Sequence, residues 1–90
     1  MNRQRLREIA RREGVPDEWY ALEGDEEAWF DGFDGFARYK AGWNAIFALK
    51  IVPGGWAVCS YERGDSFGET YFDTEDEACQ ELLMLLLASR

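Results

Sequence analysis

The polar and apolar positions of residues 2–13 repeat with the period of a helix. The apolar residues Leu6, Ile9 and Ala10 fall at i, i+3 and i+4, which places them on one narrow stripe. Asn2 is a suitable N-cap residue, and the following Gly-Val-Pro sequence ends the segment as helices commonly end. We therefore expect an N-terminal helix that buries a single apolar stripe.

The middle of the chain has the pattern of an antiparallel meander. Residues 45–52 (AIFALKIV) are strongly apolar, which indicates a central strand. Pro53 and Gly54 suit the central positions of a type II turn, so a hairpin is expected to lead into the strand 56–61. Residues 62–66 form the next reversal, which returns the chain as the strand 67–72. A short additional strand is expected at 19–22, before a turn at Glu23-Gly24.

The pattern changes back to a helix at Thr74-Glu75-Asp76-Glu77. This sequence is a capping box, in which the Thr74 hydroxyl accepts from the Glu77 N–H and the Glu77 carboxylate reaches back to the Thr74 N–H. The helix is expected to run from Glu75 to about Ala88. One face carries Ala78, Cys79, Leu82, Leu85 and Leu86. Because Leu83, Met84 and Leu87 lie off that face, either the aromatic segment before the central strand or a second subunit should cover the additional apolar side.

These elements define the expected fold, which is a single α+β domain over residues 1–90. It contains an N-terminal helix, a three- to four-stranded antiparallel meander and a C-terminal helix packed on the sheet. The longest purely apolar run, Leu82–Ala88, is far shorter than a membrane span, and arginines interrupt the N-terminal apolar residues. We therefore expect a cytoplasmic protein that does not bind membranes.

Charge is distributed unevenly along the chain, whose net charge is −8. Residues 1–12 hold five arginines and Glu8, a net charge of +4, whereas residues 13–90 hold 5 basic and 17 acidic residues, a net charge of −12. Such an acidic body disfavours nucleic-acid binding and favours a basic protein partner, although acidity also simply keeps proteins soluble. The arginines form either a solvated helix surface paired with the acidic body or a basic binding site.

The sequence contains little that indicates catalysis. There is no histidine to serve as a general base or complete a metal site, and the two cysteines, Cys59 and Cys79, do not form a CxxC motif. Both fall on expected core faces, so we expect reduced buried thiols. We expect no enzymatic activity, no cofactor and no metal.

The segment 25–42 (DEEAWFDGFDGFARYKAG) combines acids, aromatics and a repeated Phe-Asp-Gly-Phe sequence. Each Asp-Gly favours a turn, so we expect a long structured loop. The aromatics either cover the open face of the sheet or form a protruding surface for a partner. In the second hairpin, Glu62 and Arg63 form a surface ion pair, pin the turn, or contribute to binding.

Two motifs resemble one family. The sequence GWAVCSYERG (55–64), then FDTEDEAC (72–79) and a leucine-rich helix, resembles the small immunity proteins of bacterial polymorphic-toxin and contact-dependent inhibition systems. Gly14-Val15-Pro16 and Tyr20-Ala-Leu22 fit the early part of the pattern, so about two-thirds of the chain is covered. The segment 25–42 is longer and more aromatic than the family pattern, as expected of a partner-specific insert.

The resemblance implies a non-enzymatic function, in which the protein binds a cognate toxin and blocks its active site or substrate groove. A nuclease-type toxin with a basic groove would suit an acidic inhibitor. On this hypothesis the charges come from Asp25, Glu26, Glu27, Asp31 and Asp34, and the buried anchors are Trp29, Phe30, Phe33 and Phe36. Glu62 and Arg63 form a second contact region.

Two other classes of function stay open at this point. One is an acidic DNA mimic that inhibits nucleic-acid-binding proteins broadly. The other is a small homodimeric adaptor or structural module, built through the apolar C-terminal helix.

Overall fold

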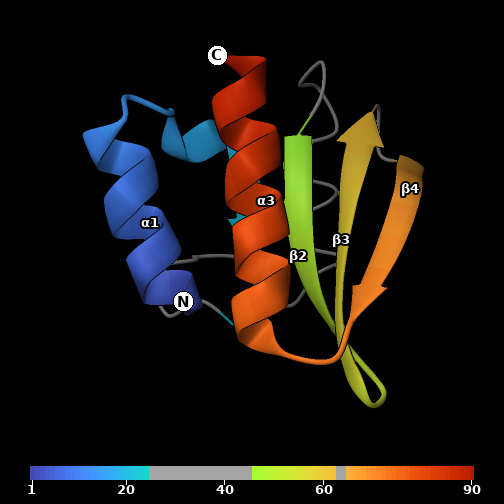
Figure 1. Ribbon diagram of the computed structural model, residues 1–90. Coiled ribbons are helices and arrows are strands. Elements are labelled where there is room, and N and C mark those ends of the chain that lie inside the picture. Colours follow the sequence, from blue (N-terminus) through green and yellow to red (C-terminus); the bar gives the residue numbers. More distant parts are fainter. Residues whose placement is uncertain (25–45, 63–64) are drawn as a thin grey trace.

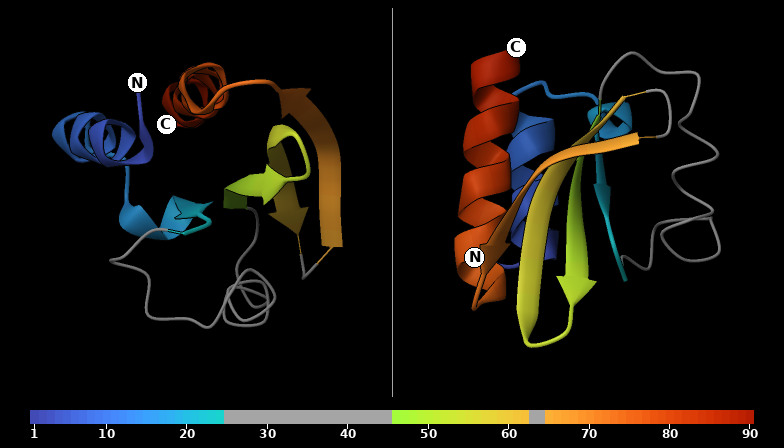
Figure 2. Two further views of the ribbon diagram at one scale, coloured as in Figure 1. Left: turned by 90° about the horizontal axis from the view of Figure 1, so that it is seen from below. Right: turned by 90° about the vertical axis from the view of Figure 1, so that its right-hand side faces the viewer.

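The computed structural model describes residues 1–24, 46–62 and 65–90 (Figure 1). The elements follow the order α1 (Arg3–Arg12), η1 (Asp17–Trp19), β1 (Tyr20–Leu22), β2 (Ile46–Val52), β3 (Gly55–Glu62), β4 (Asp65–Phe72) and α3 (Glu75–Ser89). The strands form one sheet in the order β1-β2-β3-β4. Both helices lie on one face of this sheet, so the described residues form a two-layer α+β fold and confirm the expected class (Figure 2).

The two helices begin and end for the reasons visible in the sequence. The Asn2 side chain accepts a hydrogen bond of 2.8 Å from the Arg5 N–H, and the residue after the C-cap, Gly14, has φ of +79°. Thr74 caps α3, since its hydroxyl accepts from the Glu77 N–H at 3.2 Å. The other half of the predicted capping box differs, because the Glu77 carboxylate accepts from the Thr74 hydroxyl rather than from its backbone N–H.

The hairpins follow the predicted meander with longer strands. Gly54 has φ of +82°, as the third residue of a type II turn requires, and β2 pairs with β3 antiparallel down to Val52 opposite Gly55. β3 and β4 also pair antiparallel, and their register continues to Glu62 opposite Asp65. The predicted reversal over 62–66 was therefore too wide, because the strand ladder takes up three of its five residues.

One strand pair differs from the predicted antiparallel arrangement. β1 pairs with β2 in parallel, with Tyr20 opposite Phe47 and Leu22 opposite Leu49. A parallel pair needs a crossover connection of a dozen or more residues, and the chain between Leu22 and Ile46 is long enough to supply one. β2, β3 and β4 thus form a three-stranded meander. The additional strand, β1, is connected to β2 by a crossover.

The core lies between the helices and the sheet. Its largest fully buried side chains are Leu6, Leu22, Leu49, Leu82, Leu86, Val58 and Cys79. The predicted face of α3 is largely confirmed: Ala78, Cys79, Leu82 and Leu86 are buried, while Leu85 is half-buried. Leu83 and Leu87, which the sequence placed off that face, also pack against the core. The helix therefore buries a wider surface than one stripe.

Both cysteines are free and buried, as predicted. Cys79 lies in the core of the helix–sheet interface. Cys59 alternates with Val58 along β3 and so points to the opposite face of the sheet, where Ala48 and Ala57 are also buried. Burial raises the pKa of both thiols to about 11, so both stay protonated at neutral pH.

Candidate protein-binding surface

Most of the binding residues predicted from the sequence lie outside the described residues. These are Asp25, Glu26, Glu27, Trp29, Phe30, Asp31, Phe33, Asp34, Phe36 and Arg63. Glu62 is described by its backbone, as the last residue of β3 opposite Asp65. Among the described residues, a binding surface is therefore inferred from the charges and from the exposed side chains.

Arg3 links four elements at one end of the molecule. Its Nε donates to Glu75 at the start of α3 at 2.8 Å, and its Nη1 donates to the Glu23 carbonyl after β1 at 2.7 Å. The guanidinium also lies 5.1 Å from the centre of the Trp56 ring on β3. Burial acts to raise the pKa of Glu75, but the hydrogen bonds from Arg3 outweigh it, and the pKa is lowered. Arg3 is thus a structural residue that joins both helices to the sheet.

A second arginine cluster joins α1 to the turn before β1. Arg11 donates to Asp17 through Nε and through Nη2, the latter at 2.9 Å, and Arg7 approaches the same carboxylate at 3.8 Å. The Tyr20 hydroxyl donates to Asp17, and the Arg7 guanidinium lies 5.4 Å from the centre of the Tyr20 ring. The hydrogen bond from Arg11 lowers the pKa of Asp17, whereas burial raises the pKa of Tyr20 to about 12.

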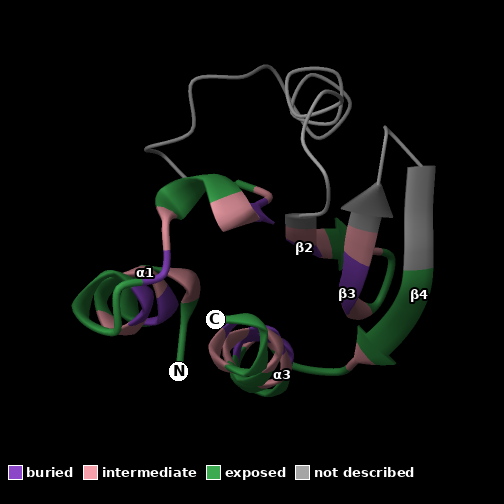
Figure 3. Ribbon diagram, turned by 90° about the horizontal axis from the view of Figure 1, so that it is seen from above, coloured by how far each residue is buried: buried purple, intermediate pink, exposed green. Residues whose placement is uncertain are grey.

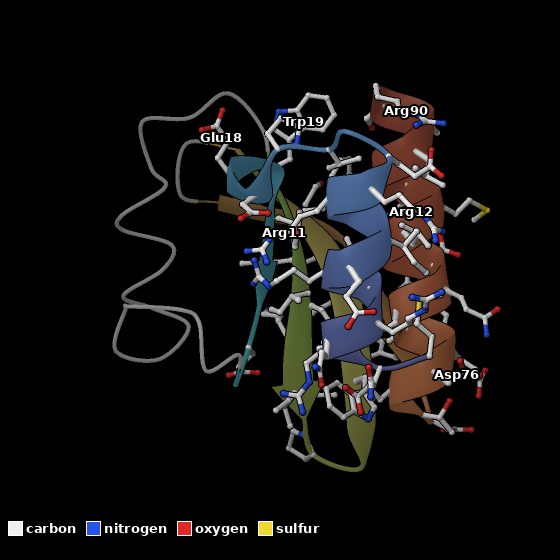
Figure 4. All side chains as sticks on the ribbon, turned by 90° about the vertical axis from the view of Figure 1, so that its left-hand side faces the viewer. Arg11, Arg12, Glu18, Trp19, Asp76 and Arg90 are labelled. Atoms are coloured by element: carbon white, nitrogen blue, oxygen red, sulfur yellow. The ribbon has the colours of Figure 1, made fainter. Side chains whose placement is uncertain are left out.

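The positive charges of α1 are therefore largely used inside the protein. Arg3, Arg7 and Arg11 bind acids of other elements, and Arg5 pairs with Glu8 one turn along the helix. At the other end of α1, Arg90 from the end of α3 pairs with Glu13. Figure 4 shows Arg11, Arg12 and Arg90 on this side of the molecule. Of the two interpretations of these arginines, the arrangement supports a helix surface paired with acids over a basic binding site.

Several acids keep their charges uncompensated. In the described part of the chain, no ion pair involves Glu18, Asp73, Glu77 or Glu81. Glu18, Asp73 and Glu77 are exposed, and Glu81 is half-buried. Because the arginines of α1 are occupied by other partners, these acids leave the described surface of β4, α3 and the η1 turn with a negative character.

β4 presents the most exposed strand of the sheet. Gly68, Glu69, Thr70 and Tyr71 are all exposed, and the Tyr71 residue is 66% exposed (Figure 3). The register with β3 shifts by one residue between Val58 and Ser60, and Gly68, with φ of +59°, supplies the extra residue on β4. Glu69 pairs with Lys50 of β2 at 3.1 Å, across the intervening β3. This surface was not predicted from the sequence, in which its signal is a strand with Gly, Glu and Thr at consecutive positions.

The outer side of α3 offers a different surface. Met84 is 58% exposed and lies among Glu77, Gln80 and Glu81, which fall on the same side of the helix. Since Leu83, Leu85 and Leu87 pack against the core, Met84 is the large apolar side chain that α3 exposes. A single exposed methionine bordered by acids is a weak basis for a homodimer through this helix.

The described residues contain no group of three or more His, Cys, Asp or Glu side chains that could hold a metal ion. None of the helices in residues 1–24 and 65–90 is both long and apolar enough to cross a membrane. Comparison with models of known families, with characterised proteins and with solved structures finds no match for this chain. The candidate function therefore depends on the sequence motifs, the fold and the surface described above.

Proposed function

We propose that this chain is an immunity protein, which binds a cognate secreted bacterial toxin and blocks its active site or substrate groove. The resemblance of residues 55–64 and 72–79 to such proteins supports this class. These motifs supply β3 and the capped start of α3, in the α+β arrangement that the resemblance implies. The protein acts by binding and not by catalysis.

The structural observation that supports this proposal most directly is the pairing of the α1 arginines. Arg3, Arg7 and Arg11 neutralise Glu75 and Asp17, so the excess of acids elsewhere on the chain is available to a basic partner. Electrostatic attraction of this kind accelerates association with a positively charged protein. A nuclease-type toxin has a basic groove because it binds phosphates, so it suits this acidic protein.

A growth-rescue assay tests the proposal. The C-terminal domain encoded immediately upstream of this gene, the candidate toxin, is induced in cells with and without this protein, and growth is followed. An unrelated acidic domain of similar size and net charge serves as the control. Rescue by this protein and not by the control is the expected result. If the upstream domain is toxic and the cells that express it grow no better with this protein than with the control, the proposal is contradicted.

The predicted contact region 25–36 is tested in the same assay. The double variant Asp31→Lys/Asp34→Lys should weaken protection, because it reverses two charges that the hypothesis assigns to the interface. The matched control is Glu18→Lys/Glu81→Lys, which makes the same change in net charge at two acids that form no ion pair in the described part of the chain. Equal protection by the two double variants would remove residues 31 and 34 from the interface.

The acidic surface also fits an inhibitor that mimics DNA. Such a protein would bind many unrelated basic proteins with similar affinity, whereas an immunity protein binds one partner tightly. Titration against a panel of basic DNA-binding proteins together with the toxin domain separates these two classes. The homodimeric module predicts dimers in sedimentation experiments at high concentration, and only monomers are expected on the proposal made here.

A further inference from the structure

Among the described residues, the sheet has an open edge at β4. β3 is the only described strand that pairs with β4, and β4 is the last strand in the order β1-β2-β3-β4. An edge strand carries a row of backbone N–H and C=O groups on its outer side that can pair with another strand. Figures 1 and 3 show β4 at the border of the sheet, and its residues 68–71 are exposed.

We propose that this edge is a docking site for an extended, positively charged segment of a partner protein, which pairs with β4 as an additional strand. The proposal rests on the proposed function in that the partner is the toxin. Backbone hydrogen bonds to an added strand supply affinity without requiring a deep groove. The side chains that flank the edge then decide which segments are accepted.

Tyr71 provides the apolar anchor of this site. It is the most exposed of the large apolar residues in the described part of the chain, and it lies opposite Ala57 of β3. Aromatic side chains contribute strongly at protein interfaces because they bury a large area with few rotatable bonds. A strand added to β4 would place its own side chains beside Tyr71, at the separation of neighbouring strands, about 4.8 Å.

The acid at the end of β4 selects the partner. Asp73 directly follows the strand, is exposed and forms no ion pair in the described part of the chain. Glu69, within the strand, is neutralised by Lys50. Together with the net charge of −8, Asp73 makes this edge complementary to a segment that carries lysine or arginine.

The net charge disfavours a second copy of this chain as the occupant. Each copy carries a net charge of −8, so two copies repel one another. This repulsion acts against self-association and leaves the edge available to a basic segment.

A peptide experiment tests the site without any toxin. The probe is the peptide Lys-Thr-Val-Thr-Val-Thr-Val-Lys, which has the same length as β4, eight residues. The comparison peptide has glutamate in place of lysine at both ends. Binding is followed by the amide ¹H–¹⁵N shifts and hydrogen exchange of the whole protein. We expect shifts and protection centred on residues 68–72, and at least tenfold weaker binding of the glutamate peptide. Shifts centred elsewhere, equal binding of both peptides, or no shifts at millimolar peptide would overturn the proposal.

The variant Tyr71→Lys should weaken peptide binding at least tenfold. Its matched control is Met84→Lys, which introduces the same residue at a similarly exposed apolar position on α3. Near-native amide spectra of both variants establish that the fold is retained. If Tyr71→Lys binds the peptide as well as Met84→Lys does, the β4 edge is not the docking site.

The growth-rescue assay then separates this inference from the proposed function. If the unmodified protein rescues growth, Tyr71→Lys should protect less well than Met84→Lys, and equal protection would overturn docking at β4 while immunity stands. If the unmodified protein fails to rescue growth, the proposed function is wrong, and the peptide experiment alone decides whether β4 accepts a basic strand.

Discussion

The two edges of the sheet differ in almost every property that governs their behaviour. β1 is three residues long, all three of its residues are buried, and arginines of α1 bind Asp17 before it and the Glu23 carbonyl after it. β4 is eight residues long, and its described residues 68–71 are exposed. A sheet edge that is covered contributes to stability, whereas one that is left open is available for pairing. The β1 edge is thus a structural end of this molecule and the β4 edge is its proposed binding end, and the following variants test this difference.

The largest effect is expected in the core beneath the covered edge. Leu22 is fully buried in β1, so Leu22→Ala should lower the free energy of unfolding by about 3 kcal/mol, because it removes buried apolar contacts and leaves a cavity. Tyr71→Ala on β4 should change it by less than about 0.5 kcal/mol. Urea unfolding curves measure both. Similar losses in the two variants would mean that the two edges contribute equally to stability.

A smaller effect is expected for the arginine that joins the covered edge to both helices. Arg3→Ala should cost about 2 kcal/mol, since it leaves Glu75 and the Glu23 carbonyl without their charged donor. Arg5→Ala is the control, because Arg5 is exposed and within the described residues pairs only with Glu8, one turn away on the same helix. Its loss should be below about 0.5 kcal/mol. Thermal or urea unfolding measures the stability of both variants. Equal losses in Arg3→Ala and Arg5→Ala would contradict the assigned role of Arg3.

Replacing the glycine of the bulge in β4 should destabilise the protein only through the backbone conformation at that position. Gly68 has φ of +59° and no atom within 4 Å of the position of an added Cβ, so Gly68→Ala should destabilise the protein by about 1 kcal/mol through its left-handed conformation. Gly14→Ala is matched, since it also has a positive φ and open surroundings, and it should give a similar loss. A much larger loss of stability for Gly68→Ala in urea unfolding would show that the backbone conformation is not the whole cause of the loss.

The smallest effect is a dependence on pH that arises at the covered edge. The pKa of Asp17 is lowered from 3.8 by Arg11, so the folded state binds its proton less readily than the unfolded state. The stabilisation is therefore present above pH 3.8 and is lost as the pH falls through the lower folded-state pKa. Asp17→Asn should flatten the decline of stability between about pH 4 and pH 2. An unchanged slope in acid unfolding would contradict the pairing of Asp17 with Arg11.

The candidate binding sites were only partly accessible from the sequence. Charge and aromatic content pointed to residues 25–36 and to Glu62-Arg63, and these predictions stay untested because they fall outside the described side chains. The β4 edge was overlooked because exposure of a strand is not a local property. The sequence Gly-Glu-Thr-Tyr (68–71) gives β4 little apolar character, but its position in the strand order is what leaves it open.

The sequence by itself determined the local elements of this protein. Asn2 and Thr74 cap their helices, Pro53-Gly54 reverses the first hairpin, and the apolar runs form β2 and α3, because each of these depends on neighbours within a few positions. Only the tertiary structure decided that β1 pairs in parallel, that Arg3 and Arg11 bind Glu75 and Asp17, and that β4 forms an open edge. These features join residues far apart in the chain, so they follow from how the layers pack and not from any local pattern.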